Sequence, residues 1–154
     1  MYQRLFSVID GIHCVSQDMK NNISYYCNDT SKIFVCYSGI DTNKFCKNPY
    51  SRHSLEASLK IVSVGRMTFA KGFANGLLVM KILKDRGLHF NWRIIGTDKN
   101  EEELVFKINQ LGLQQEVQIV GELTHEGVKN EITNADIFFL SSVYEGMANV
   151  VLEA

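Results

Sequence analysis

The sequence predicts an α/β fold in which helices cover a mostly parallel sheet. From residue 59 onward, apolar runs of four to six residues alternate with longer segments of helical periodicity. Glycines follow two of these helical segments, at Gly87 and Gly112, where a helix commonly stops. A strand, a helix and a second strand in this order favour right-handed crossovers, and therefore parallel strands.

The first third of the chain predicts two short strands and a linker. Residues 12–16 form the first expected strand, and a helical stretch follows to about residue 22. Residues 32–37 form the second expected strand, and residues 39–41 predict a turn. Residues 47–54 are polar and include the single proline, Pro49, which favours a linker.

The remaining two thirds predict four strands and the helices between them. The strands are expected at residues 59–64, 90–95, 117–120 and 136–140. The first helix should bury one face and end at Gly87; that face carries Phe73, Leu77, Met80 and Leu83. The second helix opens with three glutamates, which suit its positive dipole end, and buries Leu104, Ile108 and Leu111. A third, short helix spans residues 125–134, and Trp92 is expected in the core.

Composition limits the classes of function. The formal net charge is -1, which gives no support for a nucleic-acid partner. There is no apolar stretch of membrane-spanning length, and Asp10 and His13 interrupt any signal-peptide pattern near the N-terminus. The four cysteines show no C-x-x-C spacing, which favours reduced thiols over a zinc site or disulfides; they are Cys14, Cys27, Cys36 and Cys46. We therefore expect a cytoplasmic protein.

A first group of candidate binding residues follows the strand at 59–64. Gly65 and Arg66 come directly after that strand, and Lys71 lies five residues beyond Arg66. A guanidinium group matches phosphate geometry with its planar fork, and an ammonium group adds a point charge. Both cations could therefore converge on one diphosphate. On spacing alone, two solvated surface charges are the favoured explanation of the pattern.

A second group of candidates follows the strand at 136–140. Glu145 and Glu153 have seven residues between them, and Gly146 opens the turn into the last helix. A helix N-terminus suits phosphate, whereas carboxylates suit the hydroxyl groups of a sugar. Glu145 could instead be a simple acidic residue at a helix start. Glu153 could face solvent, although its place in the apolar run from Val150 argues for a partner.

Together the two motifs resemble the signature of retaining glycosyltransferases with the GT-B fold, above all glycosyltransferase family 4. The resemblance covers residues 58–154, with a weaker similarity over residues 5–46. It implies a Rossmann-like donor-binding domain at 58–154, truncated at its C-terminus, after a linker at 47–57. Residues 1–46 then correspond to the end of the acceptor-binding domain and the hinge turn. We expect the chain to be a fragment that lacks most of the N-terminal domain.

The resemblance also implies roles for individual residues. Arg66 and Lys71 would bind the diphosphate, and with Glu145, which would meet the donor sugar, they form the expected catalytic group. Glu153 would accept hydrogen bonds from the ribose. Further donor-binding residues are expected at the strand ends and in the last turn: Gly65, Gly96, Val120, Gly121, Gly146, Met147 and Ala148. Gly96 could equally form a plain turn with Thr97. No metal and no cofactor are expected, because cations replace the metal in this family.

The expected function is transfer of a hexose from a UDP- or GDP-sugar to a saccharide, lipid or other acceptor, with retained configuration. Polysaccharide biosynthesis is the expected setting, with the whole enzyme cytoplasmic and able to associate with the inner face of the membrane. The isolated chain is expected to be inactive. Two alternatives stay open: a catalytically incomplete fragment that binds a nucleotide, and a nucleotide-sugar epimerase. A dinucleotide-binding module is disfavoured, since no G-x-G-x-x-G follows the strand at 59–64.

Overall fold

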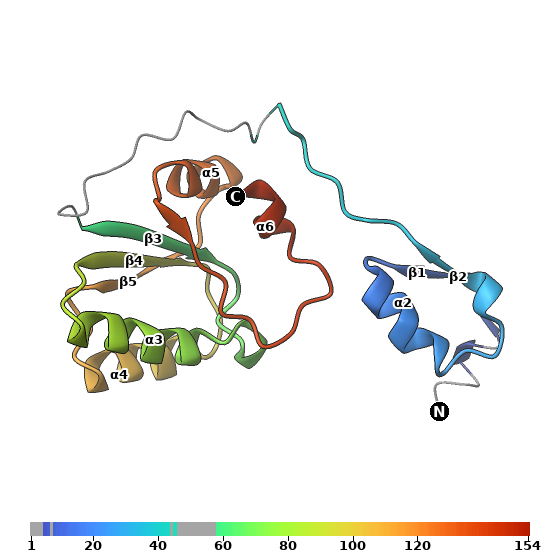
Figure 1. Cartoon of the computed structure of the whole chain (residues 1–154), viewed down its shortest axis with the longest axis horizontal. Coiled ribbons are helices and arrows are strands. Elements are labelled where there is room, and N and C mark those ends of the chain that lie inside the picture. Colours follow the sequence, from blue (N-terminus) through green and yellow to red (C-terminus); the bar gives the residue numbers. More distant parts are fainter. Residues whose placement is uncertain (1–4, 7, 44, 46–57) are drawn as a thin grey trace. The chain divides into compact units, whose positions relative to one another are not determined.

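The computed structural model describes residues 5–6, 8–43, 45 and 58–154, and the chain divides into two compact units (Figure 1). The smaller unit comprises Met1–Asp41 and Glu145–Leu152, and the larger comprises Thr42–Tyr144 and Glu153–Ala154. Each unit is described by itself. The predicted linker at residues 47–57 lies outside the described residues.

The larger unit contains a four-stranded parallel sheet with the order β5-β4-β3-β6. Its strands are β3 (Leu59–Val64), β4 (Phe90–Ile95), β5 (Val117–Gly121) and β6 (Ile137–Phe138). The strand predicted at 136–140 is thus shorter than expected. Phe139 still donates its N–H to Val62 at 2.8 Å, but the chain then turns toward Ala70, whose carbonyl accepts from the N–H of Val143 at 2.8 Å.

Helices cover both faces of this sheet. Figure 1 shows one face covered by α3 (Phe73–Asp85) and α4 (Glu101–Gln110), and the other by α5 (His125–Thr133). A single 3-10 turn, η2 (Phe69–Lys71), precedes α3 and was not predicted. The predicted last helix is α6 (Asn149–Glu153). The alternation of helices and parallel strands confirms the predicted α/β class.

The core of the larger unit lies between the sheet and the helices α3 and α4. Three of the four residues expected on the inner face of α3 are buried: Phe73, Leu77 and Met80. Trp92 is completely buried, as expected, and contacts the rings of Phe73 and Phe139. Sequence periodicity did not identify Ser63, a buried polar residue near the carboxyl end of β3.

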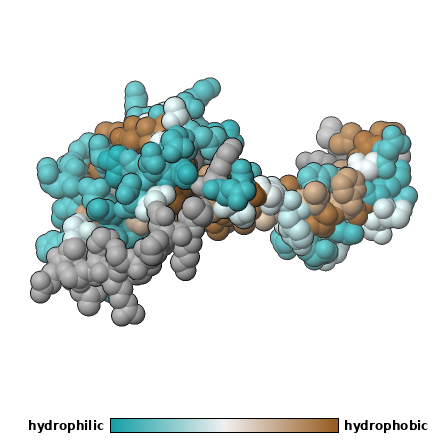
Figure 2. Space-filling view, turned by 90° about the horizontal axis from the view of Figure 1, so that it is seen from above, coloured by the Kyte–Doolittle hydropathy of each residue, from teal (hydrophilic) through white to brown (hydrophobic). Residues whose placement is uncertain are grey.

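The smaller unit contains a two-stranded parallel sheet. Its elements include β1 (Ile12–Cys14), α2 (Gln17–Ser24), η1 (Thr30–Lys32) and β2 (Ile33–Val35), and residues 149–152 of α6 also belong to it. Ser16 caps α2 by accepting a hydrogen bond from the N–H of Met19 at 3.1 Å, which fixes where the helix begins. Two short strands and a few helical turns cannot cover all their apolar side chains. Val8 and Phe34 are accordingly exposed, and Figure 2 shows apolar areas on this unit.

Candidate functional site

Three glycines meet where the strands of the larger unit end. Gly65 follows β3, Gly96 follows β4, and Gly121 is the last residue of β5. Gly65 donates its N–H to the carbonyl of Ile95 at 2.9 Å, and Gly96 donates to the carbonyl of Gly121 at 2.8 Å. The carboxyl ends of parallel strands are the usual place for ligands in open α/β sheets. The structure therefore brings together three of the predicted donor-binding residues.

Gly96 cannot be replaced without moving this edge of the sheet. Its backbone has a φ of +130°, a conformation that side-chain-bearing residues rarely adopt. A β-carbon built at Gly96 would lie 2.2 Å from the carbonyl oxygen of Gly65. The missing side chain therefore lets the main chains at the ends of β3 and β4 come into contact.

Val120 bulges out of the neighbouring strand. Ile94 pairs with Ile119, whereas the next residue, Ile95, pairs with Gly121, so Val120 has no partner in β4. Bulges of this kind often lie next to active sites, because they redirect a side chain. Val120 was predicted to line the donor site, and it is half-buried at that edge.

The loop after β3 carries the predicted cations. A β-carbon built at Gly65 would lie 3.3 Å from Cε of Lys71 and 3.4 Å from its Cδ. The aliphatic part of Lys71 therefore crosses directly over Gly65, and the side chain is half-buried. Arg66 is exposed beside it, and its carbonyl accepts from the N–H of Thr68 at 2.8 Å. The predicted first motif is thus one compact loop at the carboxyl end of β3.

A segment 70 residues away in the sequence holds this loop. The hydroxyl group of Ser141 donates to the carbonyl of Lys71 at 2.9 Å. Gly72 has a φ of +63°, and a β-carbon built there would lie 2.1 Å from the carbonyl oxygen of Ser141. Sequence reasoning did not single out Ser141. The available signal was its position between an apolar strand and Glu145.

The second motif divides between the two units. Glu145 and Gly146 belong to the smaller unit, where both are exposed. A β-carbon built at Gly146 would lie 2.8 Å from Cε of Met19 and 3.3 Å from Cγ2 of Val15. Gly146 therefore allows close packing against the start of α2. Met147 and Ala148 follow it and are half-buried, and Glu153 belongs to the larger unit and is also half-buried.

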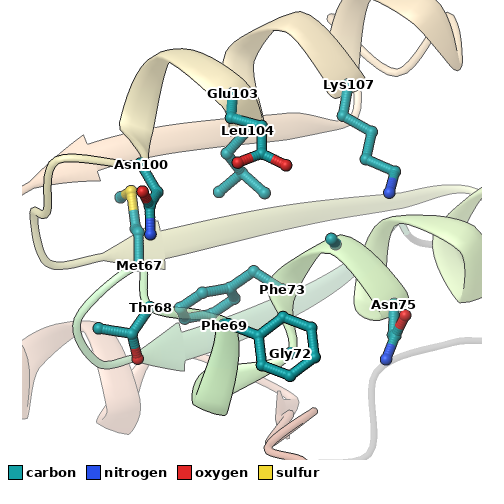
Figure 3. Close-up of a pocket in the computed structure, with 11 residues that line it drawn as sticks. Met67, Thr68, Phe69, Gly72, Phe73, Asn75, Asn100, Glu103, Leu104 and Lys107 are labelled. Carbon is teal, nitrogen blue, oxygen red and sulfur yellow. The ribbon is translucent and has the colours of Figure 1, made fainter.

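A pocket of about 100 Å³ lies on the helix side of the loop, between α3 and α4 (Figure 3). Its lining is mainly apolar, with polar side chains from both helices: Met67, Thr68, Phe69, Gly72, Phe73, Ala74, Asn75, Asn100, Glu103, Leu104 and Lys107. None of the predicted donor-binding residues lines it. The pocket and the glycine-rich sheet edge are therefore separate features that share the loop as a wall.

The described part of the chain contains neither a metal-binding group nor a membrane-spanning helix. There, no three His, Cys, Asp or Glu side chains are grouped closely enough to hold a metal ion. Cys14 and Cys27 are buried free thiols, and Cys36 is an exposed one. None of the helices in the described ranges is long and apolar enough to cross a membrane.

Comparison with known proteins decides the family. A family model described as "Glycosyl transferases group 1" matches residues 50–154, which is more than half of the chain. The chain belongs to this family. The predicted family is therefore confirmed, and membership of the group 1 glycosyltransferases supports glycosyl transfer as its chemistry.

The curated relatives of this chain are longer than the chain itself. It is 31% identical to the amylovoran biosynthesis glycosyltransferase AmsK of Erwinia amylovora, over 99% of the chain and 39% of the relative. It is 30% identical to the putative colanic acid biosynthesis glycosyltransferase WcaL of Escherichia coli K12, with the same coverage. The chain thus spans about two fifths of the length of these two relatives.

Solved structures share the fold of this group 1 chain. HepE of Anabaena, solved in complex with UDP and glucose, matches 99% of the chain and 45% of its own length, with 17% identity and a TM-score of 0.77. Sucrose-phosphate synthase of Thermosynechococcus elongatus matches 98% of the chain and 39% of its own length, with 15% identity and a TM-score of 0.80. These likenesses confirm the predicted fold class.

Proposed function

We propose that the whole protein is a retaining glycosyltransferase that transfers a hexose from a nucleoside-diphosphate sugar to a saccharide or lipid acceptor. The observation that carries this proposal is the joint position of Lys71 and three glycines at one sheet edge. Lys71 crosses over Gly65, and Gly96 and Gly121 end the two neighbouring strands. Three positions without side chains beside a cation leave room for a nucleotide whose diphosphate is negatively charged.

The proposed reaction develops charge at the leaving diphosphate. The bond between the anomeric carbon and the phosphate oxygen breaks, and a bond from the acceptor hydroxyl forms on the same face of the sugar. The acceptor proton passes to the leaving phosphate oxygen. Arg66 and Lys71 stabilise the diphosphate as its charge grows, which lowers the barrier. No metal ion is part of this proposal.

The second motif supplies the sugar contacts in this proposal. Glu145 accepts hydrogen bonds from hydroxyl groups of the donor sugar, and Glu153 accepts them from the ribose. The N–H groups of Gly146, Met147 and Ala148 face the diphosphate. Support comes from the motif itself, two carboxylates separated by seven residues after a strand, and from membership of the glycosyltransferase family.

The relatives and the fold neighbours suggest a donor and a setting to test first. AmsK and WcaL are named for the biosynthesis of amylovoran and colanic acid. HepE was solved with UDP and glucose. We therefore propose a UDP-sugar as the first donor to test and surface polysaccharide assembly as the setting.

The chain by itself is proposed to bind the donor nucleotide without transferring sugar. It spans about two fifths of the length of AmsK and WcaL, so most of the length of these two relatives has no counterpart in it. Turnover of a nucleotide sugar by the 154-residue chain alone would contradict the proposal that this chain only binds the nucleotide. It would support the proposal that the whole protein is a glycosyltransferase.

Calorimetric titration with UDP, GDP and ADP tests the nucleotide site. We expect one of them to bind saturably, and we expect Lys71→Ala to weaken it roughly 10- to 100-fold, the range for a hydrogen bond to a charged group. Lys81→Ala is the matched control, because it removes the same charge from the exposed face of α3, where Lys81 pairs with Asp85. Equal effects of the two substitutions, or no binding by the folded chain, would contradict the proposed site.

A further inference from the structure

We infer that Ser141 is a positioning residue for Lys71, and that it fixes the turn from which this cation reaches the sheet edge. This inference rests on the proposed function, because it gives Lys71 a role toward a diphosphate. It concerns a residue that touches the main chain of the loop and not the ligand.

The contact begins with two carbonyl groups at the end of the 3-10 turn. The turn closes with Lys71 donating its N–H to Thr68 at 3.1 Å and Gly72 donating to Phe69 at 3.0 Å. The carbonyls of Ala70 and Lys71 lie at its carboxyl end, where a helical turn leaves such groups without internal donors. Something outside the turn must satisfy them.

One segment satisfies both. The N–H of Val143 donates to the carbonyl of Ala70 at 2.8 Å, and the hydroxyl of Ser141 donates to the carbonyl of Lys71 at 2.9 Å. The first bond uses the main-chain N–H, so it survives any residue except proline at position 143. The second depends on the hydroxyl of Ser141, so it is the one that substitution can remove.

Packing around Ser141 leaves little freedom for either segment. A β-carbon built at Gly72 would lie 2.1 Å from the carbonyl oxygen of Ser141, so the two main chains are already in contact. A β-carbon built at Gly76 would lie 3.3 Å from the Ser141 hydroxyl, so the start of α3 borders the same hydroxyl. Ser141 is therefore tightly packed between the loop and α3.

The side chain of Lys71 is held from the other end by Gly65. With its main chain fixed by Ser141 and its methylene groups lying over Gly65, the cation has few ways to move. A fixed cation stabilises developing charge better than a mobile one, because no reorganisation is needed when the charge appears. A small displacement of the turn would lose that advantage.

This arrangement also connects the two motifs along the chain. Ser141 lies four residues before Glu145, on the stretch that leaves β6. The same short segment thus supports the cation of the first motif and leads into the acid of the second. The role of Ser141 is specific to the loop, which distinguishes it from residues that only stabilise the fold.

A double-mutant cycle on nucleotide affinity tests this role. The variants are Ser141→Ala, Lys71→Ala and the two combined, each titrated with UDP. We expect Ser141→Ala alone to weaken UDP binding about threefold to tenfold, the range for one hydrogen bond. In the Lys71→Ala background, the same substitution should have no further effect, since its action passes through Lys71.

Val117→Ala serves as the control for lost stability. Val117 is buried at the start of β5, whereas the loop lies at the carboxyl ends of the strands, so the loss of its methyl groups should destabilise the unit without changing UDP affinity. If Ser141→Ala leaves affinity unchanged while Lys71→Ala weakens it, the inference is wrong. Additive effects in the double variant would contradict it equally.

Amide hydrogen exchange tests the role of Ser141 without any nucleotide. Absence of UDP binding, or a Lys71→Ala variant that binds UDP normally, would count against the proposed function, but the exchange experiment would still test the positioning role. We expect Ser141→Ala to speed exchange at the amides of Lys71, Gly72 and Val143, and Val117→Ala to leave their relative protection unchanged. Unchanged exchange at these three amides in Ser141→Ala would overturn the positioning role, whatever the nucleotide result.

Discussion

Trp92 donates its indole N–H to the hydroxyl oxygen of Ser63, with 2.9 Å between Nε1 and Oγ. Ser63 in turn donates its own hydroxyl to the carbonyl of Phe139. Both side chains are buried, with exposed fractions of 0% for Trp92 and 1% for Ser63. This chain of two hydrogen bonds joins β4, β3 and the residue after β6, two positions before Ser141.

Replacing Ser63 by alanine should destabilise the larger unit. The substitution leaves the indole N–H of Trp92 buried without an acceptor, and it also removes a donor from the carbonyl of Phe139. We expect the free energy of unfolding to fall by about 1–3 kcal/mol, the range for an unsatisfied buried group. Urea denaturation followed by Trp92 fluorescence measures this.

Asn91→Ala is the matched control, since Asn91 is exposed on β4 beside Trp92. Its effect should stay within about 0.5 kcal/mol, as for most surface substitutions. A Ser63→Ala variant as stable as Asn91→Ala would mean that the hydrogen bonds of Ser63 contribute nothing to folding.

The sequence was most informative where local pattern and burial agree. The strands at residues 59–64 and 90–95 were predicted with the bounds that the structure has, because both are apolar runs paired on both sides within the sheet. The strand expected at 136–140 keeps only Ile137–Phe138, because the chain leaves the sheet to bond with Ala70. No local pattern indicates such a contact.

The candidate site was predictable in part for the same reason. Gly65, Gly96 and Gly121 follow predicted strands, so their meeting at one edge follows from a parallel sheet. The bulge at Val120 and the hydrogen bond from Ser141 to Lys71 depend on register and on a contact between distant segments. Those features could not be read from spacing along the chain.

Arg93 anchors α5 to the sheet, and lysine should not replace it fully. Its Nε and Nη2 each donate to one carboxylate oxygen of Glu131 at 2.7 Å, and its Nη1 donates to Gln118 at 2.6 Å. Lysine offers a point charge in place of this fork. We expect Arg93→Lys to lower the free energy of unfolding by about 0.5–1 kcal/mol, because the pair is only partly buried.

Comparison with the exposed pair of Lys81 and Asp85 separates the stabilisation that comes from the geometry of the Arg93 guanidinium from the stabilisation that comes from charge alone. Lys81→Gln should cost less than about 0.5 kcal/mol, as for exposed pairs one turn apart. The hydrogen bond to Glu131 raises the pKa of Arg93 above its usual value, so its contribution should be lost only at still higher pH. The loss of unfolding free energy in Arg93→Lys should therefore be the same at pH 6 and pH 8. A loss no larger than that of Lys81→Gln would contradict the anchoring of α5 by the Arg93 guanidinium group.

Asp29 should have an acid-sensitive role at the 3-10 turn of the smaller unit. The hydroxyl of Ser31 and then its N–H, at 3.1 Å, donate to this carboxylate, and together they hold the pKa of Asp29 below its usual value. A lowered pKa adds stability at pH values above the unfolded value of about 3.9, and that stability is lost as the pH falls through the folded value.

Carboxyl NMR titration measures the pKa of Asp29 directly. We expect a midpoint below about 3.9, and we expect Ser31→Ala to raise it, because that variant removes the larger of the two causes. Ser31→Ala keeps the main-chain donor, so the pKa should not return fully to the unperturbed value. A midpoint that Ser31→Ala leaves unchanged would show that the hydroxyl does not set this pKa.

Gly96 should tolerate alanine far less well than Gly112 does. Both have positive φ values, +130° and +67°, so both substitutions strain the backbone. A β-carbon at Gly112 meets nothing within 4 Å, whereas one at Gly96 lies 2.2 Å from the carbonyl oxygen of Gly65. We expect Gly112→Ala to cost about 1 kcal/mol of unfolding free energy, and Gly96→Ala to cost at least about 2 kcal/mol.

Because the added carbon pushes on Gly65, under the side chain of Lys71, Gly96→Ala should also weaken UDP binding, which Gly112→Ala should leave intact. Equal stabilities and equal UDP affinities of the two variants would mean that the contact between Gly65 and Gly96 does not shape this edge.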